Sequence, residues 1–539
     1  MAANATDLIR IHEKNKSERA PFTDHWRECC LYTYPQLAQM WNGTSIAQKD
    51  TGASDRAKLL DSTGTDAART LASTLVSGMT PANAQWLELR PAGIEKQDSV
   101  AHYLSEVSEV LWRNIHASNF DAEVFPSMLD FVNVGSFVLF IDINRAKGGF
   151  HFEQWPTNEC YWSSSTGGTV DTLSREYSLT AAEAFQHFGD AAGQDVKDAV
   201  QKDPGRKFNY LHVILPRQVY MIGGVTSKNM PFASVYIEQT GKRIVRESGF
   251  NEFPCVVPRC TRIPGTAYAT GVTSDALPDI KELNHLKRME KAATELAVSG
   301  MWIAEDDGVL NPYTVKVGPK KVIVANSVDS MKPLLTGADF KVAFTTEANL
   351  QAQIRRVMMA DQLLMQGSSN MTATEVNERM NLIRQQLGPI YGRLQAEFLN
   401  PLVERCFMLM MRAGVFDAPP DELNDTEFHV HYDSPLARAQ RLNEATAIQS
   451  SLGFLTNLQP AIPDILDNID TDAAARELLE TMGVPATVAR SADDVAALRK
   501  RKADMAAQQQ QGAMADQLAM QNASEQITAA NQVTGANAA

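Results

Sequence analysis

The chain has 539 residues, 44% of them hydrophobic, and its 64 acidic residues against 50 Lys and Arg give a formal net charge of −14. That length supplies material for several buried cores and excludes a small scaffold stapled by disulfides. The charge disfavours tight, sequence-specific binding to nucleic acid, because such binding neutralises phosphates with Lys and Arg. It still allows a protein that surrounds DNA and lets it slide, since strong cation–phosphate contacts would act as a brake.

The cysteine pattern indicates free thiols in a reducing compartment. The six cysteines are scattered through segments predicted to be buried, at Cys29, Cys30, Cys160, Cys255, Cys260 and Cys406. The N-terminus has no apolar core followed by a cleavage site, and no stretch reaches the roughly 18 uncharged apolar residues that a bilayer span needs. We therefore expect a soluble, unsecreted protein with no membrane partner.

The N-terminal part is predicted to be helical. Apolar residues at helical spacing predict a helix over residues 7–34, interrupted at Ser17–Pro21. A second helix is expected over 54–79 and a third over about 99–118. Between these two, residues 78–89 combine a helix end, a proline turn and a short strand.

From Phe137 the apolar period changes to two, and β-branched and aromatic residues become frequent, which predicts strands. The expected strands are 137–144, 150–154, 170–177, 208–220, 232–239, 243–250 and 255–262. Hairpin turns are expected at Arg145–Gly149 and Thr240–Lys242, with an amphipathic helix over 180–200 inserted between strands. The fold class is therefore α+β, and mainly α.

After Gly271 the pattern becomes helical again, and Ser274 or Asp275 can cap a helix that reaches about Ser299. Its acidic and basic residues nearly balance, which is typical of a solvated face. A β-rich excursion follows, with short strands expected at 302–304, 314–317, 321–324 and 334–335. Another helix is expected from about Glu347 to Met365. It leads into a flexible polar loop formed by Gln366, Gly367, Ser368, Ser369 and Asn370.

The next predicted helix is unusually long. From Thr372 to about Ala413 the apolar residues keep steps of three or four straight across Gly388–Pro389 and Asn400–Pro401. An interior proline costs about 3 kcal/mol, so the surrounding packing must fix the course of this helix, with a kink expected at Gly388 and Pro389. At about 1.5 Å per residue it would be roughly 60 Å long, which points to an elongated subunit or a large assembly.

The C-terminal part carries weaker signals. Residues 415–440 are proline-rich and expected to be extended, and short helices are expected over 441–486. Beyond Lys502 the chain has no Lys or Arg, so that tail is either disordered or a helix ordered by its neighbours.

Signatures of catalysis are missing from the sequence. It contains no G-x-x-x-x-G-K-[ST], H-E-x-x-H, C-x-x-C or G-x-S-x-G motif. Cys255 with Cys260, and His429 with His431, lack a second set of ligands, so buried or strand residues are favoured over a metal site. We expect no catalytic residues, no cofactor and no metal.

One basic cluster has two interpretations, a soluble surface or a weak patch that faces phosphate or a partner. Its members lie in the β-rich excursion, at Lys316, Lys320, Lys321 and Lys332.

The order helix, β-rich excursion, helix, polar loop and long proline-containing helix resembles the portal (head-tail connector) proteins of short-tailed, double-stranded DNA bacteriophages. The resemblance covers about residues 7–486. The segments that carry it are Arg19–Phe22 with Cys30–Pro35, Gly78–Pro81 with Trp86–Leu89, and Met371–Val376 with Gly388–Tyr391.

This resemblance implies a homo-oligomeric ring, a dodecamer, at one vertex of the capsid, with a channel through which DNA is packaged, retained and ejected. It implies the following segments: wing 1–273, stem helices 274–299 and 345–365, clip 300–344, tunnel loop 366–371, long kinked wing helix 372–414, crown region 415–486 and tail 487–539. Gln366–Asn370 would then lie against DNA in the channel.

The implied partners are double-stranded DNA bound non-specifically, major capsid and scaffolding proteins, the terminase large subunit, and tail adaptor or tubular proteins. The implied location is the virion, after assembly in the host cytoplasm, and the implied role is structural. Two alternatives stay open, another helical capsid-associated scaffold or internal virion protein, and an enzyme such as a metal-dependent nuclease.

Overall fold

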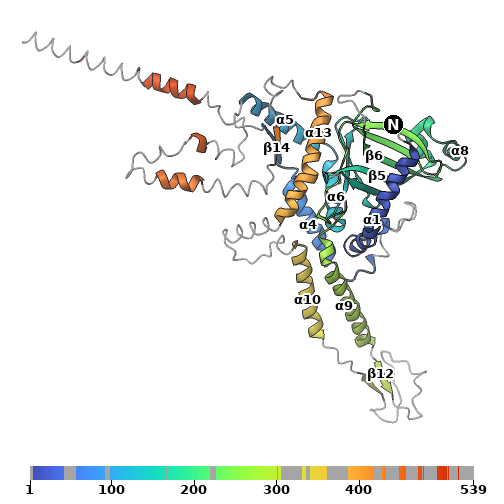
Figure 1. The fold of residues 1–539 in the computed structure, drawn as a ribbon. Coiled ribbons are helices and arrows are strands. Elements are labelled where there is room, and N and C mark those ends of the chain that lie inside the picture. Colours follow the sequence, from blue (N-terminus) through green and yellow to red (C-terminus); the bar gives the residue numbers. More distant parts are fainter. Residues whose placement is uncertain are drawn as a thin grey trace, which may run out of the picture. The chain divides into compact units, whose positions relative to one another are not determined.

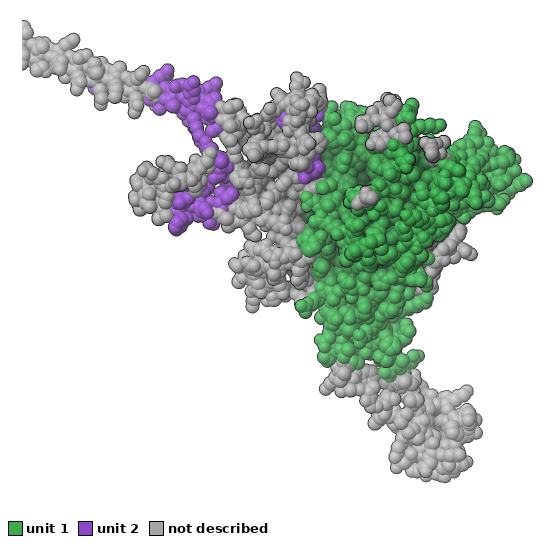
Figure 2. All heavy atoms as spheres, in the orientation of Figure 1, with its two compact units in different colours: residues 1–86, 110–417 green, residues 87–109, 418–539 purple. Residues whose placement is uncertain are grey.

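A computed structural model of the chain describes residues 4–41, 56–91, 98–165, 167–218, 226–299, 301–304, 331–334, 340–360, 387–416, 428–432, 448–456, 472–475, 478, 495–506, 508 and 520. The chain divides into two compact units (Figure 2). Unit 1 comprises residues 1–86 and 110–417, and unit 2 comprises residues 87–109 and 418–539. The described fold is α+β and mainly helical, as predicted.

The first helix is continuous. α1 spans Ala5–Thr33 with Pro21 inside it, so the interruption predicted at Ser17–Pro21 is wrong. Arg19 explains the continuity, because its buried guanidinium lies 3.7 Å from the ring centroid of Tyr161. One of its nitrogens, Nη1, also donates to the backbone carbonyls of Thr157, Asn158 and Cys160. Tertiary contacts therefore hold the turn that the proline weakens.

The helices described before the sheets are α2 (Pro35–Met40), α4 (Thr63–Met79), α5 (Asp98–His116) and α6 (Phe120–Val134). The third predicted helix corresponds to α5, whereas the helix predicted over 54–79 begins later, at Thr63. The delay has a local cause, because the amide of Thr63 donates to Asp61 Oδ1, and that of Leu60 donates to Asn284 Oδ1, both at 2.8 Å.

The sequence did not reveal α6. Residues 127–134 are all buried, so no helical period separates an apolar face from a polar one. The helix ends at Gly135, whose φ of +94° lies in the left-handed region. A Cβ there would approach the carbonyl carbon of Thr270 to 2.3 Å, so glycine is required on both counts.

Among the described residues of unit 1, two antiparallel sheets have more than two strands (Figure 1). The smaller has the order β3-β2-β9, from β3 (Phe150–Trp155), β2 (Val138–Ile143) and β9 (Cys255–Val256). The larger has the order β4-β5-β6-β7-β8, from β4 (Cys160–Ser164), β5 (Val170–Thr180), β6 (Lys207–Pro216), β7 (Phe232–Glu238) and β8 (Arg243–Phe250). The predicted turns at Arg145–Gly149 and Thr240–Lys242 join β2 to β3 and β7 to β8.

Three predictions in this region need correction. The sequence analysis missed β4, which follows the 3-10 turn η2 (Thr157–Glu159). The strand expected over 255–262 divides into β9 and β10 (Thr261–Arg262), and β10 pairs with β11 (Ala269–Thr270) instead. The helix expected over 180–200 is two helices, separated by η3 (Gly189–Ala191), where Gly189 has a φ of +55°. These helices are α7 (Ala181–Phe188) and α8 (Gln194–Lys202).

Tryptophans join α1 to the β-strands in one buried cluster. Trp26 of α1 stacks on Trp162 of β4 with ring centroids 6.4 Å apart, and Tyr268 packs against both. The indole N–H groups of Trp26 and Trp162 donate to the carbonyls of Ala269 and Ala267, so both polar atoms are satisfied. All six cysteines are free and buried, which confirms the prediction of unpaired thiols.

Two long helices lie side by side and are linked through a strand pair (Figure 1). These elements are α9 (Thr273–Ser299), β12 (Met301–Ala304), β13 (Met331–Leu334) and α10 (Phe340–Val357). β12 and β13 are antiparallel, with Met301 opposite Leu334. α10 begins earlier than the Glu347 expected from the sequence, and the strands expected at 314–317 and 321–324 lie outside the described residues.

The long helix passes Asn400–Pro401 by widening. Residues 387–394 are helical, η5 (Gln395–Leu399) is a π-helical turn, and α13 spans Asn400–Ala413. In a regular α-helix the ring of Pro401 would clash with the carbonyl of Glu397, four residues earlier, and the π-turn relieves this clash. Residues 372–386 lie outside the described part, so continuity across Gly388–Pro389 stays a prediction.

In unit 2, β1 (Leu87–Pro91) pairs antiparallel with β14 (Phe428–Tyr432), and Leu89 lies opposite Val430. The sequence predicted a short strand and an extended segment at these places but not their pairing. Short helical segments occur at 448–456, 472–475 and 495–506, and the first two fall where short helices were expected.

A buried carboxyl group yields the first testable prediction. Asp130 of α6 is 1% exposed, and its Oδ2 accepts from Thr157 Oγ1 and Gln154 Nε2, both at 2.9 Å. Burial raises the pKa of Asp130 to about 7, although both hydrogen bonds lower it. In the unfolded chain the pKa of an Asp side chain is about 3.9. The contribution of Asp130 to the free energy of unfolding is therefore present at low pH and is lost as the pH rises to about 7.

We expect Asp130→Asn to gain stability relative to the native chain as the pH rises from 4 to 7, by roughly 1.4 kcal/mol per unit of pKa shift, and then to level off. Urea unfolding followed by tryptophan fluorescence from pH 4 to 8 measures the difference. Asp66→Asn, at an exposed site on α4, is the matched control and should give no such trend. Parallel curves for Asp130→Asn and the native chain would contradict the prediction.

Candidate functional site

A buried polar cluster holds the beginning of α9. Asn133 Oδ1 accepts from the hydroxyls of Thr33 at 2.6 Å and Thr273 at 2.9 Å, and its Nδ2 donates to the carbonyl of Leu129 at 2.8 Å. Thr33, Asn133 and Thr273 are at most 2% exposed and belong to α1, α6 and α9. Leaving any of these groups unpaired would incur a desolvation penalty of about 1–3 kcal/mol, so the cluster fixes how α9 leaves the body of unit 1.

Polar contacts fix the register between α9 and α10. Lys287 of α9 forms ion pairs with Glu347 of α10 and with Glu290, the latter at 3.4 Å. Burial lowers the pKa of Lys287, but its contacts with Glu347 and Glu290 together outweigh this effect, and the pKa lies above its ordinary value. Gln353 Nε2 donates to Asp279 Oδ2 at 3.0 Å further along the pair. These contacts define an antiparallel pair.

The same register places two large exposed apolar side chains at one level of the pair. Met289 follows Lys287 on α9 and is 49% exposed, while Phe344 precedes Glu347 on α10 and is 60% exposed. Neither forms a ring contact in the described part of the chain. Large exposed apolar side chains on a pair of long helices mark a candidate contact surface.

A buried ion pair joins the π-turn to the β-strands. Glu397 of η5 accepts from Arg259, through Nε at 3.0 Å and Nη2 at 2.9 Å, and also from the Arg259 amide at 3.0 Å. The Arg259 side chain is 3% exposed, and its Nη2 also donates to the carbonyl of Gly168. The widened turn therefore presents Glu397 to a guanidinium that has almost no access to water.

A second ion-pair cluster anchors the next turns of α13. Arg405, whose side chain is 4% exposed, donates to Glu252 at 2.6 Å, and Arg412 donates to the same carboxylate at 2.7 Å. Burial raises the pKa of Glu252, but the two arginines outweigh it and the pKa lies below its ordinary range. Arg405 also lies 5.4 Å from the ring centroid of Phe250.

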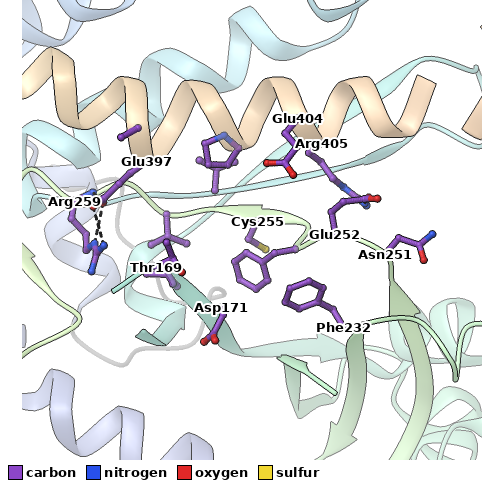
Figure 3. A pocket seen from close by; sticks show the side chains of 16 residues that line it. Thr169, Asp171, Phe232, Asn251, Glu252, Cys255, Arg259, Glu397, Glu404 and Arg405 are labelled. Atoms are coloured by element: carbon purple, nitrogen blue, oxygen red, sulfur yellow. Dashed lines mark hydrogen bonds and ion pairs between the residues drawn. The ribbon is translucent and has the colours of Figure 1, made fainter. Parts of the chain in front are cut away.

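Between these two ion-pair clusters lies a cleft of about 400 Å³ (Figure 3). Its walls come from η5 and α13 on one side and from the β5, β7 and β9 region on the other. The lining combines apolar residues such as Phe232, Phe253 and Val257 with charged ones, among them Asp171 and Glu404. A cleft of this size and lining suits the binding of a side chain or a turn.

The site residues predicted from the sequence fall largely outside the described part of the chain. Gln366–Asn370 lie outside it, as do Lys316, Lys320 and Lys321. Lys332 lies in β13, where its backbone is opposite Ile303. Gly388 and Pro389 both lie in the described start of the long helix, and Pro389 is exposed.

Sequence reasoning missed the ion pairs of Arg259 and Arg405. A single arginine within the apolar run Val256–Cys260 is a usable signal, because a buried arginine needs a carboxylate. Nothing local identifies that carboxylate, since Glu397 lies 138 residues away along the chain.

Neither a metal site nor a membrane-spanning helix occurs among the residues that the structure describes. Among the described residues, no three His, Cys, Asp or Glu side chains come together as a metal site would require. Within the same part of the chain, no helix combines the length and the apolar character that crossing a membrane requires.

Comparisons with known proteins connect this architecture to one family. A family model described as "Bacteriophage head to tail connecting protein" matches residues 5–489. The "Probable portal protein" of Bordetella phage BPP-1 is 26% identical over 527 residues, which cover 93% of this chain and 92% of that protein. The "Portal protein" of Salmonella phage epsilon15 is 28% identical over 525 residues, covering 94% and 92%. The "Portal protein" of Escherichia phage T7 is 20% identical over 417 residues, covering 73% and 72%.

The buried ion pair gives the second prediction. Glu397→Ala leaves the Arg259 guanidinium buried without its counter-charge, so we expect a loss of about 3 kcal/mol in the free energy of unfolding. Gln395→Ala, at an exposed position in the same π-turn, should lose less than about 0.5 kcal/mol. Chemical unfolding of both variants, compared with the native chain, provides the measurement. Equal losses would show that the turn, and not the ion pair, carries the stability.

Proposed function

We infer the function from a premise that the family match establishes: the chain belongs to the bacteriophage head to tail connecting proteins, and it has a phage portal function in the virion, at the capsid vertex. We propose that its subunits close into a ring, a dodecamer, whose channel passes double-stranded DNA during packaging, retention and ejection. The observation that carries this proposal is a match that extends over residues 5–489 rather than over one motif.

We assign the segments of the ring as follows: wing 1–273, stem helices 274–299 and 345–365, clip 300–344, tunnel loop 366–371, kinked wing helix 372–414, crown region 415–486 and tail 487–539. The pairing of α9 with α10 and of β12 with β13 supports the stem and clip, because a stem needs two long helices connected at one end. Their mixed charges suit helices that pack beside copies of themselves.

The charge of the chain supports a conduit rather than a DNA clamp. Each subunit carries a formal charge of −14, so a ring repels phosphate over most of its surface. The proposed tunnel loop, Gln366–Asn370, has no charged residue and can touch a sliding duplex without ion pairs. The lysines Lys316, Lys320, Lys321 and Lys332 are then candidates for contacts between the clip and DNA or a docked protein.

The proposed partners follow from a place between head and tail. They are the major capsid and scaffolding proteins on the capsid side, the terminase large subunit on the clip during packaging, and tail adaptor or tubular proteins afterwards. The family is structural, and we propose that this chain catalyses no reaction and relies on the terminase for ATP hydrolysis.

The ring can be tested at the exposed apolar pair on α9 and α10. We expect negative-stain images of the full chain to show rings with a central hole, and the variant Met289→Glu/Phe344→Glu to lose most of them. At a contact between subunits, the two introduced glutamates would lose their water and would repel one another. Asn349→Glu adds an acid at another exposed position of α10 and is the matched control. Fibres or monomers from the native chain would contradict the ring itself.

The loop is tested by removing it. We expect deletion of Gln366–Asn370 to leave ring assembly intact and to reduce DNA packaging or retention, because the uncharged loop contributes to the channel and not to the packed helices. Particle assembly with measurement of encapsidated DNA after nuclease treatment tests this prediction. Loss of rings in the deletion variant would refute the assignment of this segment as a channel loop.

A further inference from the structure

The cleft between α13 and the β-strands is lined by four carboxylates, two of which are held by arginines. Glu397 at one end pairs with Arg259 and Arg393, and Glu252 at the other end pairs with Arg405 and Arg412. Asp171 and Glu404 also line the cleft and lie on opposite sides of it in Figure 3. Neither of these two carboxylates forms an ion pair within the described part of the chain.

The chemistry of this cleft defines what fits it. The lining includes Phe232, Phe253, Val256 and Val257, so part of it favours contact with hydrocarbon. Lysine and arginine combine an apolar stem with a charged end. The stem can cover these apolar residues while the cation reaches a carboxylate of the cleft. The favoured occupant is therefore a protein turn with two basic side chains and some exposed apolar surface.

The turn between β2 and β3, residues Asn144–Gly149, has these properties. Arg145 and Lys147 are both exposed, and no ion pair to either occurs among the described residues. Ile143, at the end of β2, is 38% exposed. The turn is pre-organised, because Asn144 Oδ1 accepts from the amides of Ala146 and Lys147, both at 3.1 Å.

The β2–β3 ladder carries this turn past the level of Cys255 in its own subunit. Phe140 of β2 lies opposite Cys255, which lines the cleft, and the ladder continues from there to the pair Ile143 and Phe150. At about 3.3 Å per residue, the paired strands carry the turn roughly 13 Å beyond Cys255. The turn therefore extends away from Cys255, where it is available to the cleft of a second copy.

We propose that the Asn144–Gly149 turn of one subunit binds the cleft of its neighbour, with Arg145 and Lys147 facing Asp171 and Glu404. This inference rests on the proposed function, because it requires copies arranged in a ring. The contact is heterologous, joining two different surfaces of the same chain, and a contact of this type repeats around an axis until the ring closes. Two cations meet two carboxylates, which sets the register between neighbours as well as their attraction.

Charge reversal in the full chain tests the contact. We expect Arg145→Glu/Lys147→Glu to reduce the ring fraction measured by mass photometry at least tenfold, and Asp171→Lys/Glu404→Lys to do the same. The variant with all four changes should recover most of the rings, because the attraction is restored with its sign inverted. Lys242→Glu, in the exposed turn between β7 and β8, is the matched control. Circular dichroism checks that each variant is folded.

A cross-link provides a second test that does not depend on charge-reversed chains folding. The native cysteines are all buried, and burial raises the pKa of Cys29 to about 11, so introduced surface thiols should react selectively. Lys147→Cys/Glu404→Cys should give a ladder of multimers on oxidation, seen on non-reducing gels. Each single variant should give none, and a mixture of the two single variants should give dimers.

The outcomes separate this contact from the ring. Absence of rings from the native chain overturns the proposed function and this contact with it. If the native chain forms rings, two results overturn this contact alone. One is an unchanged ring fraction for Arg145→Glu/Lys147→Glu, and the other is the absence of a cross-linked ladder from the double-cysteine variant. Recovery by the four-residue variant together with the ladder supports it.

Discussion

Proline within helices is the constraint on which unit 1 depends. α1 and α9 contain Pro21 and Pro278, and Pro401 lies where η5 passes into α13. A proline in a helix interior removes a hydrogen bond and clashes with the preceding turn, at about 3 kcal/mol, so the helix continues only if its surroundings hold it. Buried polar contacts from neighbouring elements supply that hold, through Arg19 for α1 and Arg259 for the π-turn. The packing of unit 1 therefore fixes the course of these long helices, and their own helix propensity does not.

Local sequence patterns predicted the helices and strands that interactions between neighbouring residues determine. Alternating residues gave the strands of both sheets between 137 and 250, and helical spacing gave α5 and α9. Several failures have one source, which is a partner distant in sequence. The break expected at Ser17–Pro21 is prevented by carbonyls near residue 158, and β1 pairs with β14 from the far end of the chain. α6 was missed because burial on all sides removes the period that reveals a surface helix.

The candidate site was predictable only in part, for a related reason. The order of elements resembled a portal protein, and the family match over residues 5–489 confirms that identification. The uncharged loop at Gln366–Asn370 was chosen by its place in that order, and its role stays a prediction. The cleft could not be found in this way, because Glu397 meets Arg259 only through a π-turn that Pro401 imposes. Pro401 thus requires the π-turn that presents Glu397. The ion pair forms only because the fold also brings Arg259 beside the helix.

The same reasoning bears on how strongly acidic subunits can associate. A formal charge of −14 on every copy opposes assembly, yet at physiological ionic strength charges more than about 8 Å apart are largely screened. Association is then decided by the groups that touch, and not by the total. The proposed contact of a basic turn with the unpaired carboxylates of the cleft would allow subunits with a large net charge to attract one another at one place and in one orientation. In the proposed ring the remaining acid would repel DNA phosphates along the channel, so selective contact between subunits and weak contact with the cargo are compatible in one chain.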